Sequence, residues 1–146
     1  MKIAIASDHG GFEQKQLLIP YLNELGHEVV DCGPEDDAAV DYPDFAAVVA
    51  RAVAEGSAER GILLCGTGIG MAIAANKTPG IRAANVTSPP FAALAREHND
   101  ANIIALSGRF VTLEDNQEII HVFLETTFGE GRHVGRVAKI MGQEIR

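Results

Sequence analysis

Cysteine is scarce in this sequence, and its two copies, Cys32 and Cys65, lie far apart. They show neither the close spacing of zinc ligands nor the set of paired cysteines that staples a small secreted domain. Apolar runs are short as well. None is long enough to cross a membrane, and the run in the amino-terminal MKIAIASDHGG is too short for a signal peptide. We therefore expect a cytoplasmic protein with no membrane partner.

Positive charge is also in short supply. The 146 residues include 12 Lys and Arg against 20 Asp and Glu, which gives a formal net charge of −8 at pH 7. We expect no nucleic-acid partner, because proteins that bind nucleic acid usually present an excess of positive charge to the phosphates. Hydrophobic residues make up 47% of the chain, as in an ordinary globular protein, and the length fits one domain spanning residues 1–146.

Short apolar runs alternate along the chain with segments whose apolar residues recur at helical spacing. The expected strands are residues 2–6, 27–32, 62–64, 81–86 and 102–106. The expected helices are residues 12–26, a helix opened by Pro43, residues 71–75, residues 89–98 behind a Ser88 cap, a helix capped by Thr112, and residues 132–145. This alternation predicts an α/β protein: a three-layer α/β/α, Rossmann-like, doubly wound fold with a five-stranded parallel sheet in the order 2-1-3-4-5.

One stretch, ILLCGTGIGMAIAANK at residues 62–77, joins an apolar strand to a helix through three glycines. Glycine tolerates positive φ, so Gly66, Gly68 and Gly70 permit a tight turn. Cys65 ends the strand, where free backbone N–H groups and the positive end of the following helix come together. Such a site binds anions, favours a thiolate and stabilises an oxyanion, so we expect the chemistry here.

Three known glycine loops do not fit this stretch. A dinucleotide fingerprint needs Gly or Ala where Met71 or Ile73 stands. A Walker loop needs Lys and then Ser or Thr after the last glycine, and the arginine of a cysteine-dependent phosphatase loop would fall at Met71. The remaining alternative is a structural turn around an inert buried cysteine. Three glycines and a threonine around Cys65 favour the functional interpretation.

Two unusual loops are expected to meet in space. In a sheet of this kind, ligands bind beyond the carboxyl ends of the strands, where the strand order reverses. In the order 2-1-3-4-5, this point lies between the first and third strands. The first strand is followed by Asp8, His9 and two glycines, and the third by the Cys65 loop. We therefore expect both loops to face one crevice.

Further polar candidates follow in the second half of the chain. His98 and Asn99 close the fourth helix, and Arg109 follows the fifth strand. Arg132 and Arg136 are four residues apart, so they share one face of the last helix. His98 could simply be a favourable partner for the helix dipole, and the arginines a solvated basic surface. The functional interpretation of the arginines is a phosphate clamp, because guanidinium forks match phosphate oxygens.

Several motifs together resemble one family. SDHGG, DYPDFA, CGTGIGMAIAANKTPGIRAA, REHNDANIIALSGR and GRHVGR are similar to those of the ribose-5-phosphate isomerase B family, which includes the galactose-6-phosphate isomerase subunits. The resemblance extends from Lys2 to about Val137. One departure is visible: the family often has glycine and then a small residue before the arginine, where this chain has Ser107 and Gly108. We expect a loop of the same small residues to survive that exchange.

The resemblance implies an aldose–ketose isomerase that interconverts ribose 5-phosphate and ribulose 5-phosphate, a pentose phosphate pathway step, through an enediolate and with no metal or organic cofactor. It implies that Cys65 is the base and that the Thr67 hydroxyl, with backbone N–H groups of the loop, stabilises the oxyanion. His98, assisted by Asp8, would open the furanose ring. The implied substrate contacts are His9, Tyr42, Gly66, Gly68, Ile69, Gly70, Asn99, Arg109, Arg132 and Arg136, of which His9 and the arginines would hold the phosphate.

The resemblance also implies a homodimer, or a tetramer built from it, with active sites shared between subunits. The helix at residues 132–145 would then reach the partner, and its arginines would serve the neighbour's Cys65. Two other functions remain open. One is the same chemistry on a six-carbon substrate such as allose 6-phosphate or galactose 6-phosphate. The other is a sugar-phosphate sensor without activity.

Overall fold

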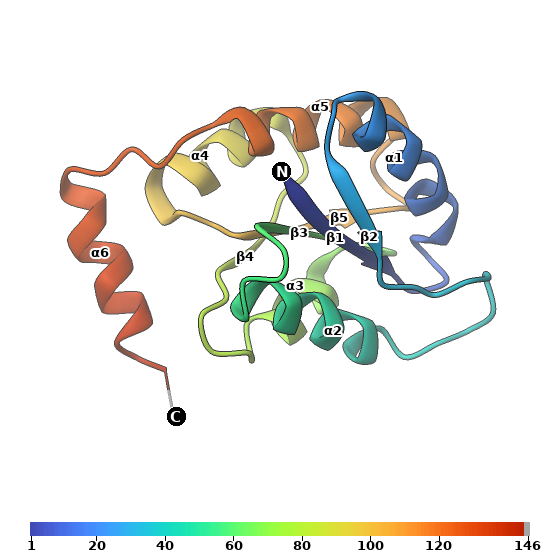
Figure 1. Ribbon diagram of the computed structural model, residues 1–146, viewed down its shortest axis with the longest axis horizontal. Helices are drawn as coiled ribbons and strands as arrows, with labels where there is room; N and C mark the ends of the chain where they lie inside the picture. Colours follow the sequence, from blue (N-terminus) through green and yellow to red (C-terminus); the bar gives the residue numbers. More distant parts are fainter. Residues whose placement is uncertain (145–146) are drawn as a thin grey trace.

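The computed structural model describes residues 1–144, which form one parallel sheet between two layers of helices (Figure 1). The strands within this range are β1 (Lys2–Ser7), β2 (Glu28–Asp31), β3 (Arg60–Cys65), β4 (Ala83–Asn85) and β5 (Ile103–Ser107). The helices are α1 (Phe12–Glu24), α2 (Tyr42–Ala54), α3 (Ile69–Ala75), α4 (Pro89–Asn99), α5 (Leu113–Glu125) and α6 (Arg132–Met141). The expected α/β alternation is confirmed.

Each face of the sheet has its own apolar core. Leu18 of α1 and Phe123 of α5 belong to the core that also holds residues of α4, on one face. Val49 of α2, Met71 of α3 and Cys65 of β3 belong to the core on the opposite face. Figure 1 shows the same division, with α1, α4 and α5 above the sheet and α2 and α3 below it. The three-layer architecture is therefore confirmed, and the Cys65 side chain points to the α2–α3 side.

The strand order is β2-β1-β3-β5-β4, with every neighbouring pair parallel. The expected order 2-1-3-4-5 is wrong for its last two strands, because β5 lies between β3 and β4. Central strands of a parallel sheet are covered on both faces and therefore apolar, as IIALS of β5 is. The neighbourhood of β4 carries Arg82 and Asn85, which suit a partly exposed edge. The reversal of order between β1 and β3 is unaffected.

Two helix starts test the expected caps. Thr112 caps α5 as expected, because its hydroxyl accepts a hydrogen bond from the Asp115 N–H at 3.2 Å. Ser88 precedes α4, but its side chain makes no capping hydrogen bond, so that expectation is wrong. Pro90 stands at the second helical position and has no N–H group, which removes one of the two donors that a capping side chain usually binds.

Helix α6 extends beyond the three layers and packs against α4 (Figure 1). It starts at Arg132 as expected and ends at Met141, short of the expected end at residue 145, which lies outside the described residues. Val137 is buried, whereas Val134 and Ile140 are 51% and 45% exposed. A helix with exposed apolar side chains of this size, standing off the body, has surface available for a further contact.

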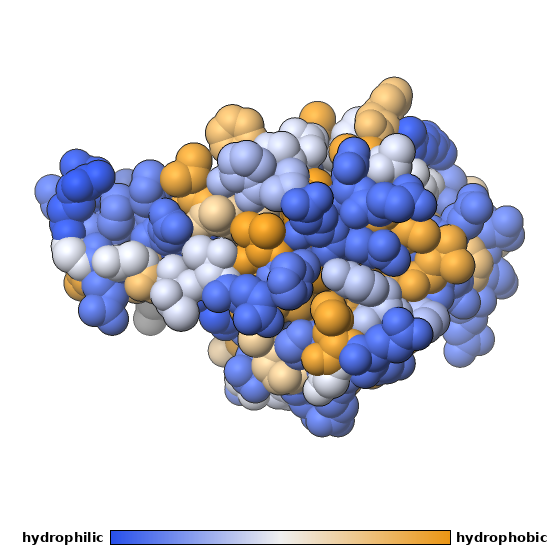
Figure 2. Space-filling model, turned by 90° about the horizontal axis from the view of Figure 1, so that it is seen from above, coloured by the Kyte–Doolittle hydropathy of each residue, from blue (hydrophilic) through white to orange (hydrophobic). Residues whose placement is uncertain are grey.

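The outer face of the α1, α4 and α5 layer is mainly hydrophilic. Figure 2 shows this face from above, where apolar residues form separate patches among polar ones. Such a mixture is ordinary for a surface that faces water. Within residues 1–144, no helix combines the length and apolar character needed to span a bilayer.

A buried lysine ties α1 to the end of β2. The Lys15 side chain is inaccessible to solvent, and its Nζ donates to the Asp31 carboxylate at 2.7 Å and to the Pro34 carbonyl at 2.9 Å. The ammonium also lies 5.3 Å from the centroid of the Phe12 ring. These contacts hold the start of the loop that leads from β2 to α2.

We expect Lys15→Met to lower the free energy of unfolding by about 1–3 kcal/mol, because it leaves a buried acceptor without its donor. Urea unfolding at a fixed protein concentration measures the change. The matched control is Lys2→Met, since the Lys2 ammonium lies 3.9 Å from Glu28 on the surface. An exposed pair of this kind contributes roughly 0–1 kcal/mol. Equal losses in the two variants would contradict the role assigned to the buried pair.

Candidate active site

Three loops meet at the carboxyl edge of the sheet. The Asp8 N–H donates to the Leu64 carbonyl at 3.1 Å, which joins the loop after β1 to the end of β3. The Gly108 N–H donates to the Cys65 carbonyl at 2.8 Å, and the Arg109 N–H donates to the Gly66 carbonyl at 3.3 Å. The loops after β1, β3 and β5 therefore form one continuous surface, as expected for the first two from the strand reversal.

The glycine loop surrounds the Cys65 sulfur. The Cys65 residue is 5% exposed, and its Sγ accepts a hydrogen bond from the Gly68 N–H at 3.1 Å. Gly68 adopts a φ of +84°, and a Cβ there would lie 2.5 Å from the Asn85 amide nitrogen. Only glycine fits this position. A backbone donor aimed at the sulfur would hydrogen-bond a negative charge on that atom.

Thr67 and Asn85 complete the loop. The Thr67 hydroxyl accepts from the Ile69 N–H at 3.1 Å, which leaves its own hydrogen to donate. The Asn85 side chain donates to the Thr67 carbonyl at 3.2 Å and to the Ala105 carbonyl at 3.0 Å. Sequence reasoning missed Asn85. Its signal is a lone amide side chain in an otherwise apolar strand.

The Asp8 carboxylate organises its own loop. Asp8 is 7% exposed, and its Oδ1 accepts from the Gly10 N–H at 2.8 Å and from the Gly11 N–H at 3.1 Å. A Cβ on Gly11 would lie 2.5 Å from the Leu64 Cβ, so this turn approaches β3 as closely as glycine permits. Within one chain, Asp8 holds the turn that contains His9. Its expected role of assisting His98 in opening the furanose ring stays a prediction.

His9 and Arg109 flank the Cys65 loop. The His9 Nδ1 accepts from the Val40 N–H at 3.3 Å, so the neutral ring carries its proton on Nε2. The Arg109 guanidinium lies across both glycine turns: Cβ atoms on Gly10 and Gly66 would each be 3.3 Å from one of its nitrogens. A cavity of about 440 Å³ beside them is lined in part by His9 and Arg109. Both side chains suit an anionic group at this edge.

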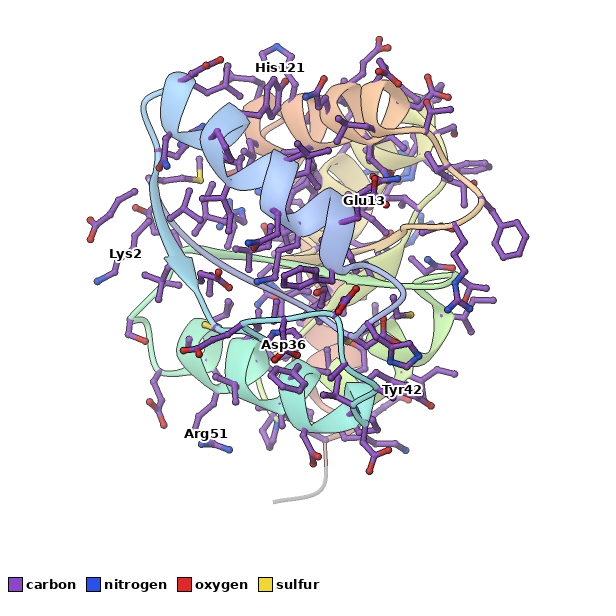
Figure 3. The ribbon with its side chains drawn as sticks, turned by 90° about the vertical axis from the view of Figure 1, so that its right-hand side faces the viewer. Lys2, Glu13, Asp36, Tyr42, Arg51 and His121 are labelled. Atoms are coloured by element: carbon purple, nitrogen blue, oxygen red, sulfur yellow. The ribbon has the colours of Figure 1, made fainter. Side chains whose placement is uncertain are left out.

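Tyr42 closes the site from the α2 side. It is the first residue of α2, and Figure 3 labels it at the lower right of that view. A Cβ on Gly70 would lie 2.7 Å from the Tyr42 ring, so the ring rests directly on the first turn of α3. Ile69, next to it, is 54% exposed. We call Asp8, His9, Tyr42, Cys65, Gly66, Thr67, Gly68, Ile69, Gly70 and Arg109 the carboxyl-edge set.

The other expected residues gather elsewhere. The His98 ring, at the end of α4, stacks on the His133 ring of α6 with centroids 4.4 Å apart and an interplanar angle of 17°. Burial lowers the pKa of His133, and the nearby His98, Arg132 and Arg136 charges lower that pKa further. These effects favour the neutral form of the His133 imidazole. We call His98, Asn99, Arg132 and Arg136 the amino-edge set.

The two sets lie at opposite edges of the sheet. Helix α4 starts after the carboxyl end of β4 and returns to the amino end of β5, so His98 lies where β5 begins. Ser107, which ends β5, is aligned with Cys65. The strand from Ile103 to Ser107 alone spans about 13 Å at the usual rise per residue. One chain therefore brings Cys65 together with His9 and Arg109, but not with His98 or the two arginines of α6.

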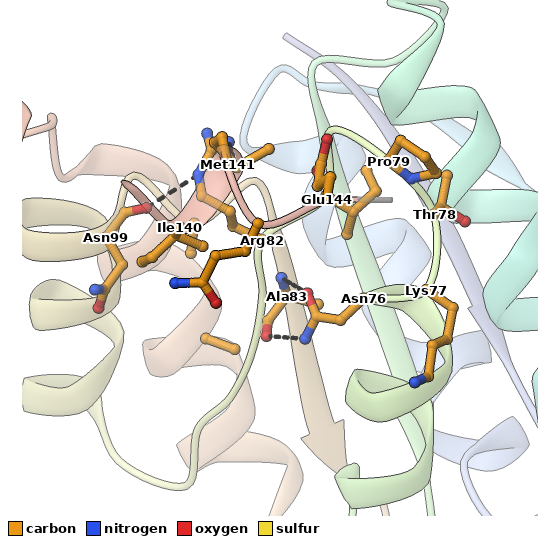
Figure 4. Close-up of a pocket in the computed structure, with 14 residues that line it drawn as sticks. Asn76, Lys77, Thr78, Pro79, Arg82, Ala83, Asn99, Ile140, Met141 and Glu144 are labelled. Carbon is orange, nitrogen blue, oxygen red and sulfur yellow. Dashed lines mark hydrogen bonds between the residues drawn. The ribbon is translucent and has the colours of Figure 1, made fainter. Parts of the chain in front are cut away.

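A larger cavity of about 570 Å³ lies on the amino-edge side, between α6 and the segment that leads into β4 (Figure 4). Asn99 and Met141 line it, and the Arg82 side chain donates to the Asn99 carbonyl at 3.1 Å. The Asn76 amide pairs with both backbone groups of Ala83, at 2.8 and 2.9 Å. Asn76 thereby covers part of the free edge of β4. This cavity contains none of the carboxyl-edge set.

The chain is similar to several known proteins over nearly its whole length. A family model described as Ribose/Galactose Isomerase matches residues 3–140. Ribose-5-phosphate isomerase B of Escherichia coli strain K12 is 45% identical over 145 residues, which cover 99% of this chain and 97% of that protein. The probable ribose-5-phosphate isomerase B of Mycoplasma pneumoniae is 48% identical over 143 residues, covering 97% and 94% of the two chains.

Solved structures give the same result. Ribose-5-phosphate isomerase B of Clostridium thermocellum superimposes with a TM-score of 0.96 at 50% identity, covering 97% of this chain and 96% of that one. The enzyme of Mycoplasma genitalium, solved with bound ribulose-5-phosphate, has a TM-score of 0.93 at 48% identity, covering 97% and 94%. The chain therefore belongs to the ribose/galactose isomerase family.

Proposed function

We propose that this protein is an aldose–ketose isomerase that interconverts ribose 5-phosphate and ribulose 5-phosphate. The observation that carries the proposal is the buried Cys65 sulfur, which faces a backbone donor at 3.1 Å and lies one loop away from His9 and Arg109. A base, an oxyanion site and an anion site are thus combined at one edge. The bound ribulose-5-phosphate of the Mycoplasma genitalium relative supports the choice of substrate.

The chemistry requires a proton to move between two neighbouring carbons. The Cys65 thiolate would remove the proton from C2 of the open-chain aldose, and the electron pair would pass to the C1 oxygen to form an enediolate. Return of the proton to C1, with transfer of the C2 hydroxyl proton to the C1 oxygen, would give the ketose. The Gly68 and Ile69 N–H groups already donate to the Cys65 sulfur and the Thr67 hydroxyl. The other backbone N–H groups of the loop at residues 66–70, together with the Thr67 hydroxyl, would stabilise the oxyanion, and one such donor typically contributes about 2.7–4 kcal/mol.

The amino-edge set would come from a second copy of the chain. Cys65 and His98 lie at opposite edges, so a site that contains both needs two subunits related by symmetry. Large apolar side chains remain exposed on three helices that could form the interface; they are Ile69 and Ile73 of α3, Phe91 of α4, and Val134 and Ile140 of α6. We therefore propose a homodimer with two shared sites.

Within a shared site, each remaining residue has a chemical role. The partner's Arg132 and Arg136 would bind the phosphate together with His9 and Arg109. His98, assisted by Asp8 across the interface, would donate the proton that opens the furanose ring. The Asn99 amide and the Tyr42 hydroxyl would bind substrate hydroxyl groups. The helix that contains the arginines stands off the body of its own subunit, which suits a helix that serves its neighbour.

Turnover of three sugar phosphates tests the proposal. We expect the purified protein to convert ribose 5-phosphate rapidly with a metal chelator present, and to convert allose 6-phosphate and galactose 6-phosphate at least 10-fold more slowly, since an extra carbon must fit the same pocket. Activity on a hexose phosphate alone would support the isomerase chemistry and show that ribose 5-phosphate is not the substrate. Binding of all three without proton exchange would indicate a sensor and overturn the proposal.

A further inference from the structure

Ser107 is a buried residue at the end of β5 that contacts the glycine loop. It is 2% exposed at the end of β5, aligned with Cys65. Its hydroxyl donates to the Gly66 carbonyl at 2.7 Å and accepts from the Phe110 N–H at 2.9 Å. The side chain therefore uses both its donor and an acceptor site to join the loop after β5 to the loop after β3.

The contact fixes a peptide plane. The Gly66 carbonyl and the Thr67 N–H belong to the same planar trans peptide, so they point in opposite directions. The carbonyl is held by the Ser107 hydroxyl at 2.7 Å and by the Arg109 N–H at the longer distance of 3.3 Å, so the Thr67 N–H is turned away from β5. A peptide that follows a glycine has unusual freedom to rotate, so a side chain that holds its carbonyl selects one orientation.

A second side chain fixes the next plane. The Asn85 amide holds the Thr67 carbonyl at 3.2 Å, and the Gly68 N–H of the same peptide then faces the Cys65 sulfur at 3.1 Å. Two consecutive peptides are thus each held by one side chain, the first by Ser107 of β5 and the second by Asn85 of β4. The sulfur receives the donor of the second peptide, so the donor of the first is the one left for a substrate oxygen.

We propose that Ser107 is a positioning residue, which locks the Gly66–Thr67 peptide so that the Thr67 N–H is prepared to receive the oxyanion. The inference rests on the proposed isomerase function. Ser107 itself does not touch the reacting atoms. Its hydroxyl restrains the glycine loop from the side of β5.

We expect Ser107→Ala to lower kcat roughly 10- to 100-fold, less than the full loss of an oxyanion donor, because the peptide is loosened rather than removed. KM should change less than about threefold. The Gln14 amide still holds the same loop through the Gly108 and Val111 carbonyls at 3.2 and 2.8 Å, so Arg109 keeps its place. Ser107→Thr, which keeps the hydroxyl, should recover most of kcat.

Ser7→Ala is the matched control. Ser7 also ends a strand at this edge and is fully buried, but its hydroxyl has no hydrogen-bond partner among residues 1–144. The Ser7 variant should keep kcat within about twofold. A Ser107→Ala protein that is folded by circular dichroism and retains the native kcat would overturn the inference, as would equal losses in the Ser7 and Ser107 variants.

A readout without substrate separates this inference from the proposed function. The Thr67 N–H should have a lower NMR order parameter in Ser107→Ala than in the native protein, because its peptide plane is less restrained, and the native value in Ser7→Ala. If the native protein isomerises no sugar phosphate, the proposed function fails and the order parameters still test the positioning role of Ser107. An unchanged Thr67 order parameter in Ser107→Ala would contradict that role whatever the activity.

Discussion

Cys65→Ala is expected to lower kcat for ribose 5-phosphate by roughly 10²- to 10⁴-fold, the usual contribution of a positioned proton-transfer group. The sulfur is the buried group that faces the loop donors, and a methyl group in its place can neither take nor return a proton. Coupled-assay turnover gives kcat. Exchange of the substrate C2 hydrogen with D₂O isolates the proton-transfer step and should fall by the same factor.

The rest of the carboxyl-edge set should survive this change. The Cys65 backbone carbonyl accepts from the Gly108 N–H, a contact that alanine preserves. Inorganic phosphate should therefore bind the Cys65→Ala variant with native affinity, by calorimetry. Near-normal hydrogen exchange in the variant would remove Cys65 as the base and direct attention to another group in the pocket.

The second cysteine offers a matched control. Burial raises the pKa of the Cys32 thiol, and the neighbouring Asp31 charge raises it further, so Cys32 stays protonated at neutral pH. It follows β2, away from the reversal of strand order. Cys32→Ala should retain native kcat. A comparable loss in both alanine variants would point to a general effect of removing thiols rather than to chemistry at Cys65.

Mixing two inactive variants should restore activity if the sites are shared. One variant carries Cys65→Ala, and the other carries both Arg132→Ala and Arg136→Ala. In a heterodimer, one site then contains every substitution and the other contains none. Random pairing of equal amounts should give about one quarter of native activity, since half of the dimers are mixed and half of their sites are intact. Turnover is measured after the two proteins are unfolded and refolded together.

A second mixture controls for nonspecific recovery. Cys65→Ala combined with Thr67→Ala places both lesions in the carboxyl-edge set, so every site keeps one defect and little activity should return. No recovery in the arginine mixture, with mixed dimers detected by mass, would show that the site lies within one chain or uses neither arginine. Recovery in both mixtures would contradict the division of the residues into two sets.

The sequence predicted those features that depend on local pattern. The alternation of strand and helix patterns predicted the three layers. The loops at Asp8 and Cys65 were placed correctly because the reversal between β1 and β3 does not depend on the order of β4 and β5. The position of β5 could not be obtained in the same way. The local pattern is the same whether β5 pairs with β3 or lies outside β4. Its actual position depends on which strands are covered on both faces in the folded sheet. The polarity around Arg82 and Asn85 was the available clue.

For the site, the identities of the residues were easier to predict than the groups that their side chains contact. His98 and the arginines were identified from their motifs, but only the course of α4 shows that they lie at the edge opposite Cys65. Asn85 and the hydrogen bonds of Ser107 were missed. Both side chains act on loop carbonyls, and nothing in the spacing of residues indicates which carbonyl a buried hydroxyl or amide will reach.

The separation of Cys65 from the arginine helix has an evolutionary consequence. In the proposed dimer each protomer contributes a different part to each site, so a duplicated gene would be free to diverge in an asymmetric way. One copy can lose its thiol and keep its arginines, while the other keeps the thiol and loses the arginines, and the pair still builds one working centre. The proposed dimer would thus permit an obligate two-gene enzyme to arise from a symmetric ancestor through loss alone, without any new catalytic residue.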